Sequence, residues 1–315
     1  IACMLAPSIE WLIAARLLQA LGGCAGPVLG RAVIRDVYGR ERGAKMLSYV
    51  GSAMALAPAV GPVLGGWLQD FYGWRASFAL LSGFSALAFI GTWFLLDESN
   101  KQRDPLATRP FHIYSNLILM LRSREYLGYL AASSATYCGL FAWISGSSHV
   151  FVEVMGLKPS HYGMVFAAIV VGFIIGTQIG GRITMRVGIA RIVGIGCVIN
   201  AICGVALAGL ALALPPNIPG LLIPMVLNMI GVGLVLPNAM AGAIGPFPEK
   251  AGAASALMGF SIFGLAAFAG QAVALTFDGT EHPMALVIGL GGAGSLLCYV
   301  LLVRPVAKAL GQKIL

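Results

Sequence analysis

The sequence predicts an all-α integral membrane protein, and three observations lead to this fold class. Hydrophobic residues make up 58% of the 315 residues, charged residues make up only 10%, and the mean hydropathy is +0.88. Soluble domains are about 45–50% apolar and about 25% charged, so this chain lies far from that class. The apolar residues also gather into runs of about 20, the length of a helix that crosses roughly 30 Å of hydrocarbon.

Nine of these runs are long enough to span a bilayer. In chain order they are residues 12–30, 46–68, 78–96, 127–148, 162–183, 192–214, 219–244, 251–277 and 284–303. Residues 1–6 have the composition of the end of another apolar helix. We therefore expect nine transmembrane helices and the remnant of a tenth at the N-terminus.

Lysine and arginine collect at alternate ends of the spans, which predicts the orientation of the chain. Apart from Arg16, only Arg75 and Lys158 among the 20 lysines and arginines fall on one side of the membrane. The side that carries the others is expected to be cytoplasmic. The net charge of +8 therefore reflects topology, and no basic stripe with interleaved aromatic residues points to nucleic acid.

The longest polar stretch of the chain, residues 97–125, divides it into two parts. Three predicted spans precede this stretch and six follow it, whereas many carriers consist of two six-helix halves. We expect a truncated N-terminal half at 1–96, a cytoplasmic central loop at 97–126 and a six-helix C-terminal half at 127–315. Three further helices are expected to precede residue 1.

Arg16 is the one ionisable residue well inside a predicted span. A charge at that depth is costly in lipid and is normally retained for a function. Its nearest acid in the sequence, Glu10, is about 9 Å away along a helix axis. We expect Arg16 to face a cavity and to influence the protonation of a carboxylate on one of the missing helices. A structural arginine bonded to helix-end carbonyls is the alternative.

Glycines that recur every four residues predict close helix packing, because small residues let helix backbones approach. They are Gly22, Gly26 and Gly30 in the first span, Gly61 and Gly65 in the second, and Gly172, Gly176 and Gly180 in the fifth. In the second span Pro58 and Pro62 each remove a backbone hydrogen bond. The second helix is therefore expected to bend and to move against a neighbour.

The segments that carry these features resemble motifs of the major facilitator superfamily. Residues 61–66 read GPVLGG and resemble the antiporter motif GPxxGG in the fifth helix of its drug efflux carriers. Residues 16–22 read RLLQALG and are similar to RxxQGxG in the fourth helix, with Ala20 in place of the usual glycine. Residues 181–188, GRITMRVG, resemble the second-half copy of the loop motif between helices two and three.

Three further segments resemble the Bcr/CflA drug-resistance branch: RDVY at 35–38, APAVGP at 57–62 and FPEKAGAASA at 247–256. The resemblance covers most of residues 12–270 and implies a major facilitator fold with nine of the usual twelve helices. It also implies motif and helix-packing roles for Gln19, Gly22, Arg35, Asp36, Pro58, Gly61, Pro62, Gly65, Gly66, Gly181, Arg182, Arg186 and Gly188.

The function that the resemblance implies is multidrug resistance by an antiporter, which exports amphipathic drugs or other small molecules in exchange for protons by alternating access. Arg16 is the proton-coupling candidate. Candidate residues lining the substrate cavity are Tyr137, Phe141, Trp143, Asn228 and Asn238, since aromatic rings with sparse polar groups suit lipophilic substrates. Helix packing or an interhelical hydrogen bond is the alternative role for each of the five.

The expected partners are a small-molecule substrate, protons and membrane lipid. The protein is expected to be a multi-pass monomer of the bacterial inner membrane, with its central loop and C-terminus in the cytoplasm. The six cysteines form no CxxC pair and the four histidines lack metal-ligand spacing. We therefore expect neither a metal site nor a cofactor.

Three other functions stay open at this point. An importer or a metabolite exporter with the same fold is one alternative, and an inactive truncated carrier is another. A membrane-embedded enzyme is disfavoured, because it needs clustered Asp, His or Ser in or near its spans. Asp278, Glu281 and His282 instead share one short loop between two predicted spans. We expect no enzymatic activity.

The charge distribution makes a prediction about topology. Reporter fusions within 97–125 should behave as cytoplasmic, and fusions within 215–219 should behave as external, because positive residues are retained inside. Alkaline phosphatase and green fluorescent protein fusions at the two sites measure this. Phosphatase activity from a fusion in the 97–125 stretch would contradict the predicted orientation.

Overall fold

The computed structural model describes residues 1–26, 60–96, 117–247 and 250–312, together with isolated positions between 29 and 57. Within these residues the regular structure is helical, as predicted, and no strand occurs. The chain divides into two compact units. The first consists of the described residues in Ile1–Pro105 and Lys158–Ala167, and the second of those in Leu106–Leu157 and Ala168–Leu315.

The first unit contains α1 (Ile9–Gly23), a helical segment at residues 60–72, α3 (Trp74–Leu95) and the first turns of α6 (Pro159–Val187). α1 begins after Ser8, because the Ser8 hydroxyl accepts a hydrogen bond from the Trp11 amide at 3.3 Å. Gly73 alone separates residues 60–72 from α3, and its φ of 78° is a conformation that favours glycine. The Arg75 guanidinium donates to the Ala6 carbonyl at 3.1 Å and ties α3 to the residues before α1.

The second unit contains α5 (Arg124–Ser148), η1 (His149–Val154), the rest of α6, α7 (Ile189–Ala213), α8 (Ile218–Ile244), α9 (Ala251–Thr276), α10 (His282–Cys298), η3 (Tyr299–Val303) and α11 (Arg304–Ala309). Polar side chains begin two of these helices. Ser123 accepts the Tyr126 amide at 3.3 Å, and Asn217 accepts the Gly220 amide at 2.7 Å. Gly188, with a φ of 91°, makes the turn between α6 and α7.

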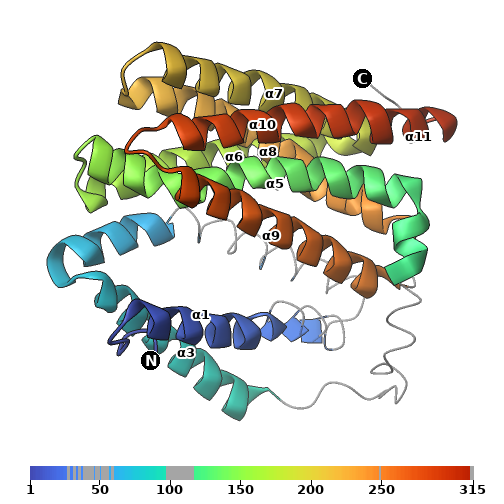
Figure 1. The fold of residues 1–315 in the computed structure, drawn as a ribbon. Coiled ribbons are helices and arrows are strands. Elements are labelled where there is room, and N and C mark those ends of the chain that lie inside the picture. Colours follow the sequence, from blue (N-terminus) through green and yellow to red (C-terminus); the bar gives the residue numbers. More distant parts are fainter. Residues whose placement is uncertain are drawn as a thin grey trace. The chain divides into compact units, whose positions relative to one another are not determined.

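Helices of the second unit lie side by side along most of their length (Figure 1). α7 packs against both α8 and α10, and α5 contacts α8, α9 and α10. The core among them includes the buried rings of Tyr126, Tyr129 and Tyr299. The Tyr126 hydroxyl donates to the Ala254 carbonyl of α9 at 2.7 Å, so this buried phenol has a partner.

Helices α6 and α8 approach one another through glycine. Gly172 and Gly176 of α6 face the carbonyl oxygens of Val226 and Ile230, and a Cβ on either glycine would overlap the oxygen opposite. Gly180, the third glycine of the repeat, also faces α8, where it lies against the side chains of Asn238 and Leu234. The close packing predicted from this repeat is confirmed.

The crossing of α7 and α10 follows the same principle. A Cβ on Gly292 would overlap the Asn200 carbonyl oxygen, and a Cβ on Gly204 would lie 3.0 Å from the Ile288 carbonyl oxygen. Because no side chain separates the two backbones at these points, the second unit depends on main-chain contact between its helices.

Seven helices among the described residues are long and apolar enough to cross a membrane. They correspond to the third to ninth predicted spans, while the first two, 12–30 and 46–68, fall partly outside the described residues. Several of these helices are longer than predicted, most clearly α6, which covers Pro159–Val187 instead of 162–183. The reason is that polar residues at both ends of the apolar run continue the helix.

The glycine contacts between α6 and α8 predict a strong effect of added side-chain volume. Gly176→Val should destabilise the protein by about 1–3 kcal/mol or prevent folding, because the valine would overlap the α8 backbone. The matched control is Gly209→Val in α7. Among the described residues, a Cβ added to Gly209 would have no neighbouring atom within 4 Å. Thermal unfolding of the purified variants measures the difference. Equal melting temperatures for the two would contradict the packing.

Candidate functional site

Arg16 lies on α1 with its side chain exposed in the first unit. Its Nη1 donates to Gln19 Oε1 at 2.5 Å, one turn further along the helix. Its guanidinium carbon lies 5.9 Å from the centroid of the Phe78 ring on α3. The two polar residues of the 16–22 stretch are therefore paired with each other, and the arginine keeps further donors for other groups.

A cavity of about 540 Å³ lies beside this pair, within the first unit. Gln19 and Phe78 line it, together with Cys3, Ser82 and Ser85. The two serines of α3 did not emerge from the sequence, because isolated serines are common in membrane helices and only their position beside Gln19 marks them. The cavity combines one amide, two hydroxyls and aromatic carbon.

Three of the predicted motif residues, Arg35, Asp36 and Pro58, lie outside the described residues. Four of the predicted packing glycines have open space around them among the described residues: a Cβ added to any of them would have no neighbouring atom within 4 Å. These are Gly22, Gly26, Gly61 and Gly65. The packing role of these glycines stays a prediction. Pro62 and Gly66 do make a close contact, with the first turns of α6.

The 181–188 stretch forms the end of α6 and the turn into α7. Arg182 and Arg186 are exposed, and an added Cβ on Gly181 would meet no other described part. Arg186 lines a cavity of about 580 Å³ with Glu125 and Tyr129.

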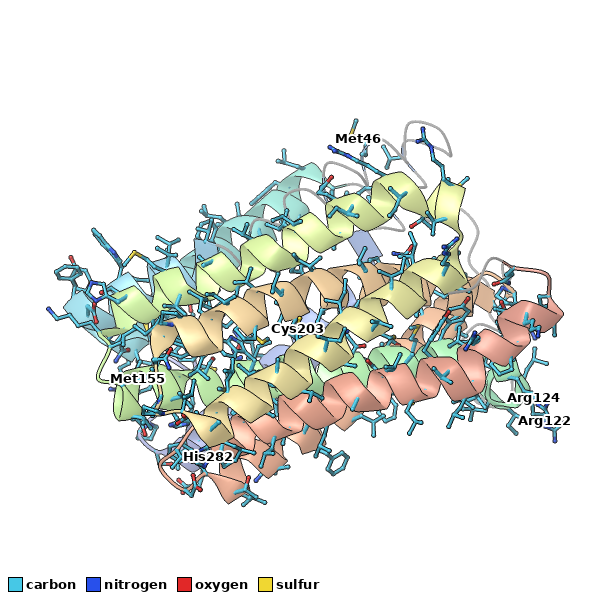
Figure 2. All side chains as sticks on the ribbon, turned by 90° about the horizontal axis from the view of Figure 1, so that it is seen from above. Met46, Arg122, Arg124, Met155, Cys203 and His282 are labelled. Carbon is cyan, nitrogen blue, oxygen red and sulfur yellow. The ribbon has the colours of Figure 1, made fainter. Side chains whose placement is uncertain are left out.

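The basic residues mark one end of the second unit. Figure 2 shows Arg122 and Arg124 at one end of its helices, and Met155 and His282 at the other. Glu125 lies at the first of these ends, where its carboxylate accepts a hydrogen bond from Gln312 at 3.3 Å. The cavity beside Arg186 therefore opens at the arginine-rich end.

Two of the aromatic cavity candidates lie together on α5. The Tyr137 and Phe141 rings are stacked, with centroids 6.3 Å apart and an interplanar angle of 24°. Phe263 of α9 meets Tyr137 edge-on at 5.2 Å and is 60% exposed. The three rings form an aromatic row that is partly open. Phe263 was missed because phenylalanine in an apolar run carries no signal of its own.

Trp143, the third aromatic candidate, has a different environment. Its side chain is fully buried and its ring lies 5.6 Å from that of Phe151. The indole N–H has no hydrogen-bond partner among the described residues. The structure therefore places Trp143 in the core of the second unit, apart from the open row of Tyr137, Phe141 and Phe263.

The two asparagine candidates on α8 are buried and hydrogen-bonded between helices. Asn228 donates to the Asn200 carbonyl of α7 at 3.2 Å. Asn238 donates to the Leu234 carbonyl at 2.8 Å and accepts from the Thr184 hydroxyl of α6 at 2.7 Å. These contacts fit the packing role that the sequence left open for both residues.

Asn200 was not predicted and lies at the centre of a buried polar cluster. Its Nδ2 donates to the Thr136 hydroxyl of α5 at 3.4 Å, and its Oδ1 has no hydrogen-bond partner among the described residues. That oxygen lies against the backbone of Gly231 on α8, where an added Cβ would overlap it. Asn200 thus links α7 with both α5 and α8.

The loop between α9 and α10, with the first residue of α10, holds Asp278, Glu281 and His282, the ionisable residues that were considered for a membrane enzyme. Asp278 Oδ1 accepts hydrogen bonds from the Thr280 hydroxyl at 2.5 Å and from the Thr280 amide at 3.0 Å. The hydroxyl contact is the main reason that the pKa of Asp278 is below its ordinary value. His282 donates its backbone amide to the Thr280 hydroxyl at 3.3 Å. These bonds stabilise a turn.

Comparison with known proteins identifies the class of this chain. The Major Facilitator Superfamily profile matches residues 1–271. Together with the membrane-spanning helices, this match shows a multi-pass membrane transport protein. The chain belongs to the Major Facilitator Superfamily.

Several bacterial proteins are similar to this chain. It is 30% identical over 308 residues to a bicyclomycin resistance protein homolog of Haemophilus influenzae, covering 96% of this chain and 76% of that protein. It is 28% identical over 256 residues to a chloramphenicol resistance protein of Pseudomonas aeruginosa, covering 80% of this chain and 59% of that protein. It is 25% identical over 299 residues to multidrug resistance protein D of Escherichia coli, covering 93% of this chain and 73% of that protein. The relationship to the Bcr/CflA drug-resistance branch is thereby confirmed.

The hydrogen bond between Thr184 and Asn238 predicts a measurable coupling between α6 and α8. In a double-mutant cycle of Thr184→Val and Asn238→Ala, the coupling energy should be about 0.6–1.7 kcal/mol, between the average and the maximum for such bonds in membranes. Unfolding free energies of the parent, both single variants and the double variant give the value. Strictly additive losses would show that the two side chains do not interact.

Proposed function

We propose that this chain acts in the proton-coupled export of amphipathic small molecules by alternating access. The observation that carries the proposal is the similarity to the bicyclomycin resistance homolog, which extends over 96% of this chain. Two other relatives are named for resistance to chloramphenicol and to multiple drugs. The glycine and proline stretch 61–66 and the aromatic row of the second unit fit such a carrier.

In this proposal the aromatic row of Tyr137, Phe141 and Phe263 contacts the substrate. Stacked and edge-on rings offer flat apolar surface, and the Tyr137 hydroxyl adds one polar group at its edge. Asn228 and Asn238 act by holding α8 in place through their interhelical bonds. The buried Trp143 supports α5 from the core.

Arg16 is the proposed proton-coupling residue of the first unit. Its contacts with Gln19 and Phe78 orient the guanidinium without neutralising its charge. A cation close to a carboxylic acid lowers the pKa of that acid and so favours proton release. The carboxylate that carries the proton is expected on another helix of the carrier.

The proposal also includes the orientation and the assembly. The arginine-rich end of the second unit, which carries Arg122 and Arg124, faces the cytoplasm of a bacterial cell. The carrier works as a monomer in the inner membrane, with its C-terminus and the 97–126 loop inside.

Drug accumulation in cells tests the export direction. A strain that lacks its own efflux carriers and expresses the whole open reading frame should accumulate less chloramphenicol than the empty-vector strain. A protonophore should abolish the difference, because the proton gradient drives export. Equal accumulation with and without expression of a correctly inserted protein would exclude export of this drug. Higher accumulation on expression would show uptake.

Replacement of Arg16 separates coupling from folding. Arg16→Ala should preserve folding and drug binding, but it should reduce drug-induced proton release by roughly tenfold or more, since one pKa unit of lost influence corresponds to tenfold. Arg16→Lys should retain part of the coupling, because the charge survives while the planar donor fork is lost.

Proton release and drug binding are both measured on the purified full-length protein. A well-folded Arg16→Ala variant with normal proton release would rule out the coupling role and would favour a structural arginine.

A further inference from the structure

Two segments of the first unit are in direct backbone contact. Residues 60–72 meet the first turns of α6, and Lys158–Ala167 belongs to the same compact unit as residues 60–72. A Cβ on Gly66 would overlap the Pro159 carbonyl oxygen. A Cβ on Gly163 would lie 2.5 Å from the Pro62 carbonyl oxygen. The contact is reciprocal, because each segment supplies one glycine and one carbonyl.

Asp70 lies one helical turn beyond Gly66 on the same segment. Pro62, Gly66 and Asp70 are spaced by four residues, so they share one face of the helix. That face is the one that meets α6, because Asp70 Oδ2 accepts a hydrogen bond from the Ser160 amide at 3.2 Å. The carboxylate therefore extends the glycine contact by one turn.

The hydrogen bond occurs at a favourable point of α6. The first amides of a helix have no carbonyl partner within the helix, and Pro159, the first residue of α6, has no amide hydrogen. Ser160 supplies such an unpaired amide, and a negative charge is stabilised at this positive end of the helix dipole. Asp70 thus caps α6 from a segment 90 positions earlier in the chain.

We propose that Asp70 is a positioning residue that latches residues 60–72 to the beginning of α6. The inference rests on the proposed export by alternating access, in which one end of the carrier must open and close. Glycine contacts alone allow the two backbones to slide, because they present no side chains that interlock. The Asp70 bond to Ser160 has a fixed partner and therefore selects one arrangement of the two segments. Loss of this hydrogen bond favours the arrangement in which the two segments separate.

The surroundings give the latch access to water. Asp70 is exposed and lines a cavity of about 760 Å³ with Trp67, Lys158 and Met164. According to the predicted topology this cavity lies on the external side, where Lys158 is one of the few positive residues. Water can therefore replace Ser160 as the partner of the carboxylate when the segments part.

A pair of spin labels reports the separation of the two segments directly. Phe71→Cys and Met164→Cys are suitable sites, since both side chains are exposed and line the same cavity. The labels are placed in the full-length protein after its native cysteines are replaced. Pulsed electron paramagnetic resonance in lipid nanodiscs then gives the distance distribution between them.

Three variants are compared with this labelled parent. Asp70→Ala removes the acceptor, and Asp70→Asn keeps an acceptor oxygen but loses the charge. Gln69→Ala is the matched control, because it removes an exposed polar side chain at the adjacent position.

The parent is expected to show mainly the short distance. Asp70→Ala should raise the ratio of the long to the short distance by roughly three- to tenfold, the range for the net loss of one ordinary hydrogen bond, because water competes for this exposed carboxylate. Asp70→Asn should give a smaller rise, and Gln69→Ala should leave the distribution unchanged.

A parent-like distribution in Asp70→Ala, or in Asp70→Asn if the alanine variant does not fold, would overturn the latch. An equal shift in Gln69→Ala would also overturn it. Drug transport is measured on the same labelled proteins after reconstitution into liposomes. Absence of transport in the parent would count against the proposed export alone, because the distance comparison requires no substrate.

Discussion

Contact between helix backbones at glycine is the interaction on which the described structure depends. Lipid provides no hydrophobic drive that would pull two apolar helices together, so close van der Waals contact must replace it. The second unit makes this contact between α6 and α8 at Gly172 and Gly176, and between α7 and α10 at Gly292. The first unit makes it between residues 60–72 and α6 at Gly66 and Gly163. α6 takes part in both units.

Such close packing determines what the polar residues can do. Because the helices touch, a buried amide or hydroxyl meets a group on the next helix, as Asn228, Asn238 and Thr184 do. Three buried side-chain polar atoms, Ser134 Oγ, Trp143 Nε1 and Asn200 Oδ1, have no hydrogen-bond partner among the described residues. The row of Tyr137, Phe141 and Phe263 combines aromatic surface with partial exposure. In the proposed carrier, packing and substrate contact are thus assigned to different residues.

The sequence predicted the helical class and the third to ninth spans, because runs of about 20 apolar residues have few other structures available to them. It also predicted the packing role of Gly172 and Gly176, since a four-residue interval keeps glycines on one helix face. The sequence did not predict which of the aromatic candidates are buried and which are exposed. Periodicity within a uniformly apolar helix does not distinguish a buried ring such as Trp143 from an open one such as Phe263.

Individual side-chain contacts between distant segments could not be predicted. The bond between Asp70 and Ser160 joins residues 90 positions apart, and the sequence contains no signal that pairs them. The same holds for Ser82 and Ser85 beside Gln19, which became candidates only once α3 was seen next to α1. The motifs identified individual helices, whereas the residues that contact one another between helices became known only from the structure.

Proton-driven substrate movement in proteoliposomes tests the central claim most directly. Purified full-length protein is reconstituted, and an imposed pH gradient is the only source of energy. The account predicts that chloramphenicol accumulates in the acidic lumen against its own concentration gradient, and that an ionophore which collapses the pH gradient releases it. Accumulation that is unaffected by collapse of the pH gradient would contradict proton-coupled export.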